Sequence, residues 1–156
     1  MSYRYHIDSP IGVICIEADE RAITRLFFDR EEKALHKQEK PETDLLKKAG
    51  EQLMEYFSGK RKTFDLPLAP SGTEFQKKVW KALCQIPYGE TRSYGEIAAQ
   101  IGNPKACRAV GGANNKNPIM IFIPCHRVIG ADGSLVGFGG GIDAKKFMLN
   151  LEKGAE

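Results

Sequence analysis

The chain has 156 residues, of which 42% are hydrophobic and 28% are charged, and its formal net charge is +3. This is the composition of an ordinary globular protein with enough apolar side chains for a core. No run of about 18 apolar residues occurs, so the sequence predicts no transmembrane helix. The first residues also lack the basic and apolar regions of a secretion signal. We therefore expect a soluble protein of the cytoplasm.

The N-terminal part is predicted to form a small sheet with one helix packed on it. Three strand-like runs are separated by stretches rich in turn-forming residues, which indicates an antiparallel meander. The runs are 3–7, 13–17 and 23–28. Apolar residues then recur at helical spacing from Leu45 to Phe57 and stop at Gly59.

A linker marked by Pro67, Pro70 and Gly72 divides the chain into two expected domains, 1–68 and 69–156. The second domain has a mostly helical pattern. Its first helix is expected to begin at a cap provided by Ser71 or Thr73.

The next two helices are predicted from their end signals. Ser93 and Glu96 fit the S-x-x-E capping box, and Gly102 is a typical helix stop. Asn103 and Pro104 then favour the start of a helix over about 104–115. Two short helices joined in this way predict a helix-turn-helix, although the same pair also occurs as ordinary packing without any DNA.

The two domains differ in charge. Residues 1–68 carry a net charge of −1 and residues 69–156 carry +4. Between 91 and 131 the only acidic residue is Glu96. The basic residues there are Arg92, Lys105, Arg108, Lys116 and Arg127. Such a surface would attract a phosphate backbone, but ordinary variation in surface charge gives the same pattern.

The four cysteines are scattered and form no C-x-x-C pair, so we expect neither a metal site nor a disulfide framework. Cys125 differs in its surroundings, because an apolar run precedes it, His126 follows it and a glycine-rich loop comes next. A free thiol is mostly protonated at neutral pH and needs a base to become a nucleophile, and His126 is the obvious one. A carboxylate should orient the imidazole, and Glu152, Asp143 and Asp132 are all candidates. The simpler alternative is that Cys125 is a core residue.

The last helix, at about 143–152, is expected to turn Phe147, Met148 and Leu151 towards the core.

The segment Ile123-Pro-Cys-His-Arg-Val128 resembles the active-site motif of the O6-methylguanine-DNA methyltransferases. The resemblance is dense and in order over about 70–156, whereas residues 1–68 match only in general character. The other matching segments are 73–80, 86–91, 93–98, 102–105, 108–114, Asn117-Pro118 and the glycine loop that ends at Lys145. It implies an α+β or α/β fold, with a ribonuclease H-like N-terminal domain and a helical, winged-helix-like C-terminal domain. It also implies a monomer without cofactor or metal.

The resemblance implies a single irreversible transfer to Cys125 of the alkyl group of O6-alkylguanine, and of O4-alkylthymine, in double-stranded DNA. His126 would act as the base through a water molecule, and Glu152 would orient its ring. Asn117 would brace the turn that presents the cysteine. Tyr94 would press on the backbone beside the target nucleotide and help to protonate the leaving guanine.

The resemblance also implies how DNA would bind. The target nucleotide must leave the stack, because the duplex hides its alkyl carbon from sulfur. Arg108 would fill the gap, and Gly139 would offer its backbone N–H near O6. Small residues would keep the second helix of the pair slim enough for the minor groove, and Arg127 is expected to contact DNA as well. The small residues are Ala109, Gly111, Gly112 and Ala113.

Two residues depart from the family pattern. Phe138 stands where many members have tyrosine, and Met120 where several have proline. Two alternatives remain open: a module that only binds alkylated bases, which would not need Cys125, and a Cys–His hydrolase, which would need an oxyanion hole and would turn over.

Overall fold

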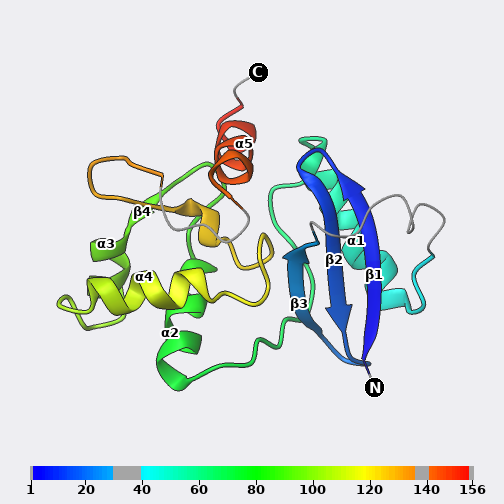
Figure 1. The fold of residues 1–156 in the computed structure, drawn as a ribbon, viewed down its shortest axis with the longest axis horizontal. Helices are drawn as coiled ribbons and strands as arrows, with labels where there is room; N and C mark the ends of the chain where they lie inside the picture. The colour runs from blue at the N-terminus through cyan, green and yellow to red at the C-terminus, as the bar shows by residue number, and fades with distance from the viewer. Residues whose placement is uncertain (1, 30–39, 136–140, 155–156) are drawn as a thin grey trace. The chain divides into compact units, whose positions relative to one another are not determined.

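The structure is a computed structural model that describes residues 2–29, 40–135 and 141–154. The chain separates into two compact units, Met1–Pro70 and Ser71–Glu156. Figure 1 shows the sheet of the first unit and the helices of the second.

The first unit is the predicted antiparallel meander with one helix. Strands β1 (Tyr3–Ser9), β2 (Gly12–Ala18) and β3 (Ile23–Phe28) pair in the order β1-β2-β3, and α1 (Asp44–Phe57) packs on β1 and β2 (Figure 1). Thr43 caps α1 by accepting a hydrogen bond from the Leu46 amide. The meander and the helix therefore confirm the sequence-based prediction.

The second unit begins with α2 (Glu74–Leu83), β4 (Arg92–Ser93) and α3 (Tyr94–Gln100). Both helices have the reciprocal bonds of a capping box, formed by Thr73 with Gln76 and by Ser93 with Glu96. The cap of α2 is thus Thr73 rather than Ser71.

The helix expected from residue 104 begins later, at Cys107, and α4 covers Cys107–Asn115. The reason is a turn: the Ala106 amide donates to the Asn103 carbonyl over 2.9 Å, with Pro104 at the second position, where its fixed φ is favoured. Helices α3 and α4 pack on each other and form the expected helix-turn-helix pair.

The last elements are β5 (Val128–Ile129), which runs parallel to β4, and α5 (Ile142–Glu152). Met148 is buried, but Phe147 is 37% exposed, so the expectation that Phe147 points inward was wrong. The inward face of α5 instead carries the polar residues Lys145 and Glu152, at a rotation that leaves Phe147 outside.

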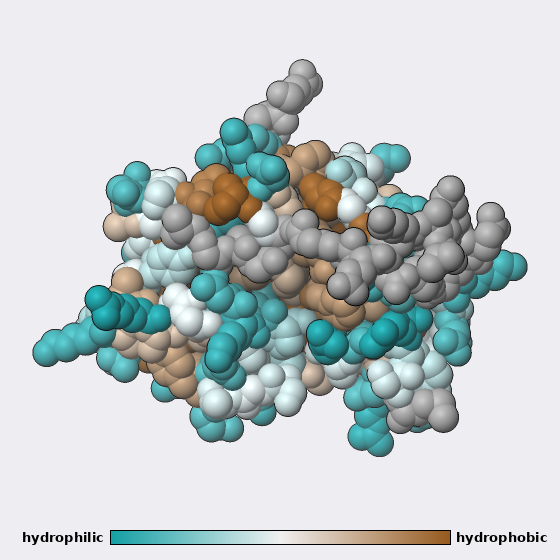
Figure 2. Space-filling view, in the orientation of Figure 1, coloured by the Kyte–Doolittle hydropathy of each residue, from teal (hydrophilic) through white to brown (hydrophobic). Residues whose placement is uncertain are grey.

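Figure 2 shows mostly hydrophilic residues on the face in view, with smaller hydrophobic areas between them.

Candidate active site

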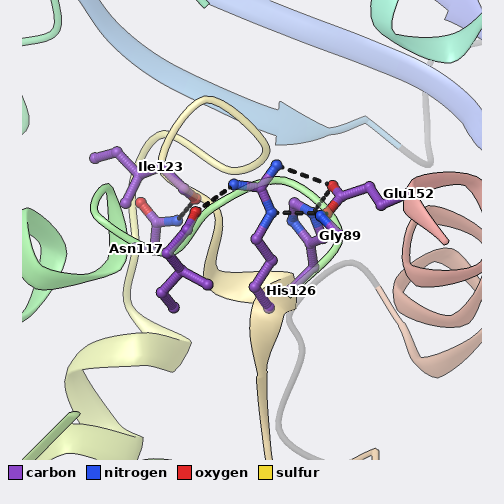
Figure 3. A network of polar contacts seen from close by, with 7 residues as sticks. Gly89, Asn117, Ile123, His126 and Glu152 are labelled. Atoms are coloured by element: carbon purple, nitrogen blue, oxygen red, sulfur yellow. Dashed lines mark hydrogen bonds and ion pairs between the residues drawn. The ribbon is translucent and has the colours of Figure 1, made fainter. Parts of the chain in front are cut away.

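Cys125 lies in a tight turn that follows a buried apolar segment. All five residues from Ile119 to Ile123 are buried, and Cys125–Arg127 forms a 3₁₀ turn. Asn117 supports this segment at two points: its Nδ2 donates to the Ile123 carbonyl over 2.8 Å (Figure 3), and its Oδ1 accepts a hydrogen bond from the Ile119 amide at 3.0 Å. The segment departs from extended backbone at Ile121, whose φ is 72°. Because a β-branched residue is strained in that region, the packing around it must hold this conformation in place.

The Cys125 thiol is protonated in the resting protein. The side chain is only 2% exposed, and burial raises its pKa to about 11, against the opposing effects of a hydrogen bond from Asn117 and of the Lys145 charge. The Asn114 amide also contacts this residue, since its Nδ2 donates to the Cys125 carbonyl at 3.4 Å. Any reaction at sulfur therefore requires a route for the proton.

His126 and Glu152 form a buried pair behind the cysteine. The His126 Nε2 and the Glu152 Oε2 are 2.6 Å apart, and the His126 side chain is fully buried. Of the three carboxylates that the sequence left open, Asp132 and Asp143 are exposed, and only Glu152 reaches the ring. Figure 3 shows both residues of the pair: His126 comes from the 3₁₀ turn and Glu152 from α5.

The charges of this pair follow from its surroundings. Burial opposes ionisation of Glu152, but hydrogen bonds from His126 and Arg127 and the charge of Arg127 outweigh it and lower its pKa to about 2. Burial lowers the pKa of His126. Glu152 is thus a carboxylate and His126 a neutral ring whose Nε2–H donates to it. The ring's Nδ1 carries the lone pair, is buried, and has no hydrogen-bond partner among the described residues.

Arg127 points into the protein rather than towards DNA. It is 7% exposed; its Nε donates to Glu152 Oε1 at 2.7 Å, its Nη2 to Oε2 at 3.1 Å, and its Nη1 to the Ile86 carbonyl at 2.8 Å. The guanidinium is thus directed at Glu152 and Ile86 and not at the surface. The geometry therefore does not support the expected DNA contact of Arg127.

Lys145 is a site residue that the sequence reasoning missed. It is fully buried, and its Nζ donates to the Val128 carbonyl over 2.6 Å. Burial lowers the pKa of Lys145, and the neighbouring Cys125 raises it, so the two groups lie close enough to interact. The sequence signal was a lysine at a core-facing position of the last helix. A lysine is rarely fully buried unless it has a partner.

Tyr94 is placed beside Cys125 by the pairing of β4 with β5. Strand β4 ends directly before Tyr94, the first residue of α3, and β5 directly follows the 3₁₀ turn. Burial raises the pKa of Tyr94, and the nearby Cys125 and Cys107 raise it further. Its hydroxyl is therefore protonated at neutral pH and can act as a donor. The ring also lies along α4, because a Cβ on Gly111 would be 3.9 Å from it.

The other predicted DNA contacts are divided between two faces of α4. Arg108, Ala109 and Gly112 are exposed, as a DNA-binding face requires. Ala113 instead faces the core, and its carbonyl accepts the Trp80 indole N–H over 2.8 Å. Its expected contact with DNA therefore lacks support. Gly139 and Phe138 lie outside the described residues, and Met120 is buried.

Within residues 2–29, 40–135 and 141–154, no three His, Cys, Asp or Glu side chains are grouped so that they could hold a metal ion. No helix in that part of the chain is long and apolar enough to cross a membrane.

Comparison with known proteins gives consistent results over the whole chain. The model of the 6-O-methylguanine DNA methyltransferase ribonuclease-like domain matches residues 1–70, and that of the DNA binding domain matches residues 74–154. The methylated-DNA–protein-cysteine methyltransferase of Methanosarcina mazei is 56% identical over 153 residues, which cover 97% of each protein. The constitutive enzyme of that name from Bacillus subtilis is 49% identical, over 98% of this chain and 96% of its own.

Solved structures agree with the sequence relatives. The crystal structure of Mycobacterium tuberculosis O6-methylguanine methyltransferase has a TM-score of 0.88 and 48% identity, and the match covers 100% of this chain and 95% of the other. The structure of Mycobacterium tuberculosis OGT in complex with DNA has a TM-score of 0.87 and 49% identity, over 97% of this chain and 92% of the other. The fold predicted from the sequence, a ribonuclease-like domain followed by a helical DNA-binding domain, is thereby confirmed.

Proposed function

This chain belongs to the 6-O-methylguanine DNA methyltransferase family, and from that premise we propose that Cys125 is the cysteine that receives the alkyl group. The protein is a methylated-DNA–protein-cysteine methyltransferase that acts in DNA repair. The observation that carries the assignment is the buried Cys125 turn with the His126–Glu152 pair directly behind it. A histidine–carboxylate pair also lies near Cys15, formed by His6 and Asp29 at 3.2 Å, but Cys15 lies in the ribonuclease-like unit, whereas Cys125 lies in the unit that matches the DNA binding domain.

The reaction begins with loss of the thiol proton. His126 is neutral, and its Nδ1 lone pair accepts that proton through one bridging water, because the Nε2–H is committed to Glu152. The thiolate sulfur then attacks the alkyl carbon on O6 of guanine. A carbon–sulfur bond forms as the carbon–oxygen bond breaks, and the electron pair leaves with the guanine. Glu152 stabilises the imidazolium that forms in this step.

Tyr94 protonates the leaving guanine. Its hydroxyl keeps its proton at neutral pH, and its interaction with Cys125 supports a role beside the reacting base. The product is a thioether, which is a poor leaving group, so each molecule reacts once. Asn117 holds the Ile119–Ile123 segment in the shape that presents the sulfur.

The helix-turn-helix binds the damaged duplex. The target nucleotide is flipped into the Cys125 pocket, and Arg108 enters the stack in its place. Exposed Ala109 and Gly112 let α4 approach the minor groove closely. We assign the same chemistry to O4-alkylthymine, which presents an equivalent alkyl–oxygen bond, and we place the protein in the cytoplasm as a monomer that needs no cofactor.

The test is mass spectrometry of peptides after reaction with duplex DNA that contains O6-methylguanine. We expect one methyl group on the Cys125 peptide and none on Cys84 or Cys107, both of which are exposed and serve as internal controls. Labelling that follows exposure rather than the site would contradict the assignment. Repeated turnover with excess DNA would point to a hydrolase instead.

A further inference from the structure

We propose that Arg127 is a positioning residue for the transfer: by neutralising Glu152 it keeps His126 uncharged and ready to accept the proton of Cys125. This inference rests on the proposed role of Cys125 and gives Arg127 a task inside the site, in place of the DNA contact expected from the sequence.

The contacts of Arg127 are those of a fixed group. Two of its nitrogens bind the two oxygens of Glu152, at 2.7 and 3.1 Å, and a third binds the Ile86 carbonyl at 2.8 Å. Its guanidinium also lies 5.7 Å from the centre of the Tyr88 ring. A paired, planar fork of this kind fixes the carboxylate in orientation as well as in charge. This pairing favours the orientation in which Glu152 presents Oε2 to His126.

Glu152 by itself would favour the wrong form of His126. A carboxylate 2.6 Å from a buried imidazole stabilises the imidazolium, and an opposite charge at such a distance shifts a pKa by about one to three units. The positive charge of Arg127 compensates for the negative charge of Glu152, so the ring faces a pair with no net charge. Burial makes the largest contribution to lowering the pKa of His126, Glu152 acts to raise it, and Arg127 lowers it in opposition to Glu152.

The other groups around the ring do not replace Arg127. Lys145 on α5 also lowers the pKa of His126, and its ammonium donates a hydrogen bond to the Val128 carbonyl. Cys125 is a neutral thiol in the resting state. Tyr88, in the loop before β4, is a neutral phenol, because burial raises its pKa. Arg127 carries the positive charge that is paired with the carboxylate orienting His126.

The consequence is a prediction about pH rather than about rate alone. An imidazolium has no lone pair on Nδ1 and cannot take the thiol proton. When Arg127 is replaced by Met, which keeps an apolar stem of similar length, the rise of transfer rate with pH should occur at a pH higher by about one unit or more. Arg127→Lys keeps the positive charge but loses the paired hydrogen bonds to Glu152. The rate constant should therefore be lower than in the parent, but its increase with pH should occur at nearly the same pH.

A charge-balanced set of variants tests this. The single-turnover rate constant for methyl transfer from O6-methylguanine DNA is measured between about pH 5 and 9 for each protein. The rise of the rate with pH is the acid limb of the profile. Glu152→Gln should move this limb to lower pH, because the positive charge of Arg127 is then uncompensated. The double variant Arg127→Met/Glu152→Gln carries neither charge, and its acid limb should return towards the parent position. Arg61→Met, which removes an exposed Arg–Glu pair in the first unit, is the matched control and should leave the profile unchanged.

A second measurement separates this proposal from the proposed function. Nitrogen NMR of the His126 ring in the Cys125→Ser protein gives its pKa without any transfer reaction, and Arg127→Met in that background should raise it. If methyl transfer to Cys125 fails in the parent while the ring pKa rises, only the proposed function is lost. If Arg127→Met lowers the rate by one factor at every pH, or leaves the ring pKa unchanged, Arg127 is merely structural and the proposal is overturned. If Arg127→Met does not fold, the double variant provides the test. An acid limb at higher pH than in Glu152→Gln supports the proposal, and an acid limb at the same pH as in Glu152→Gln overturns it.

Discussion

Replacing Glu152 by Gln should destabilise the protein at neutral pH by an amount that disappears in acid. The pKa of Glu152 lies at about 2, against an ordinary value of 4.5. A difference of this size corresponds to about 3 kcal/mol of folding stability. The structural source is the buried set of bonds to Arg127, His126 and the Gly89 amide. The same loss can be judged from Arg127, whose buried guanidinium is left without its charged partner, a change that typically costs about 3 to 5 kcal/mol; the two figures describe one interaction and are not added.

The sign of the pH dependence is fixed by the lowered pKa. The unfolded chain binds a proton at Glu152 near pH 4.5 and the folded chain only near pH 2. The stabilisation is therefore fully present above about pH 4.5 and is lost as the pH falls through that window. A protonated Glu is nearly the same shape as Gln, so the parent and the variant should approach each other in stability at the acid end.

The assay is urea unfolding of the parent and of Glu152→Gln at a series of pH values from neutral to about pH 3, where roughly half of the difference should already be lost because the folded-state pKa is about 2. The control is Glu55→Gln, which breaks an exposed pair with Arg61 and should cost at most about 1 kcal/mol. A free energy of unfolding for Glu152→Gln equal to that of the parent at neutral pH would refute the reasoning. A difference that stays constant down to the acid end would show that it comes from packing and not from charge.

Three further predictions concern the reaction and DNA. Cys125→Ser should bind DNA as the parent does but transfer no methyl group, because a hydroxyl is far harder to ionise than a thiol. Gel shift measures the binding and mass spectrometry the transfer, and more than a trace of transfer would contradict the assignment. DNA affinity should fall with salt with a log–log slope of about −3, since Lys105, Arg108 and Lys116 are exposed while Arg127 is buried; titration at several salt concentrations measures it, and a flat response would argue against phosphate contacts. Methylated protein should be less stable than free protein by about 1 to 3 kcal/mol, because one methyl group enters a pocket in which Cys125 is 2% exposed; equal thermal midpoints would show that the pocket accepts the adduct without cost.

The local features of this protein were predictable because their signals lie within a few residues of each other. The strand runs and their turns gave the meander, and the Ser93–Glu96 box gave the start of α3. The Pro-Cys-His-Arg sequence singled out Cys125 and His126, since a nucleophile and a candidate base stood side by side. Even here the start of α4 was misplaced, because the turn from Asn103 to Ala106 competes with the helix signals of Asn103 and Pro104.

The tertiary structure decided every choice between residues that are distant in sequence. Asp132, Asp143 and Glu152 are equivalent as acids, and only the packing of α5 brings Glu152 within 2.6 Å of His126. Arg127 looked like a surface base, yet the same packing turns it towards Glu152. A buried charge is tolerated only with a partner, and the partner of Arg127 lies 25 residues away in the chain, in an element whose rotation no local pattern specifies.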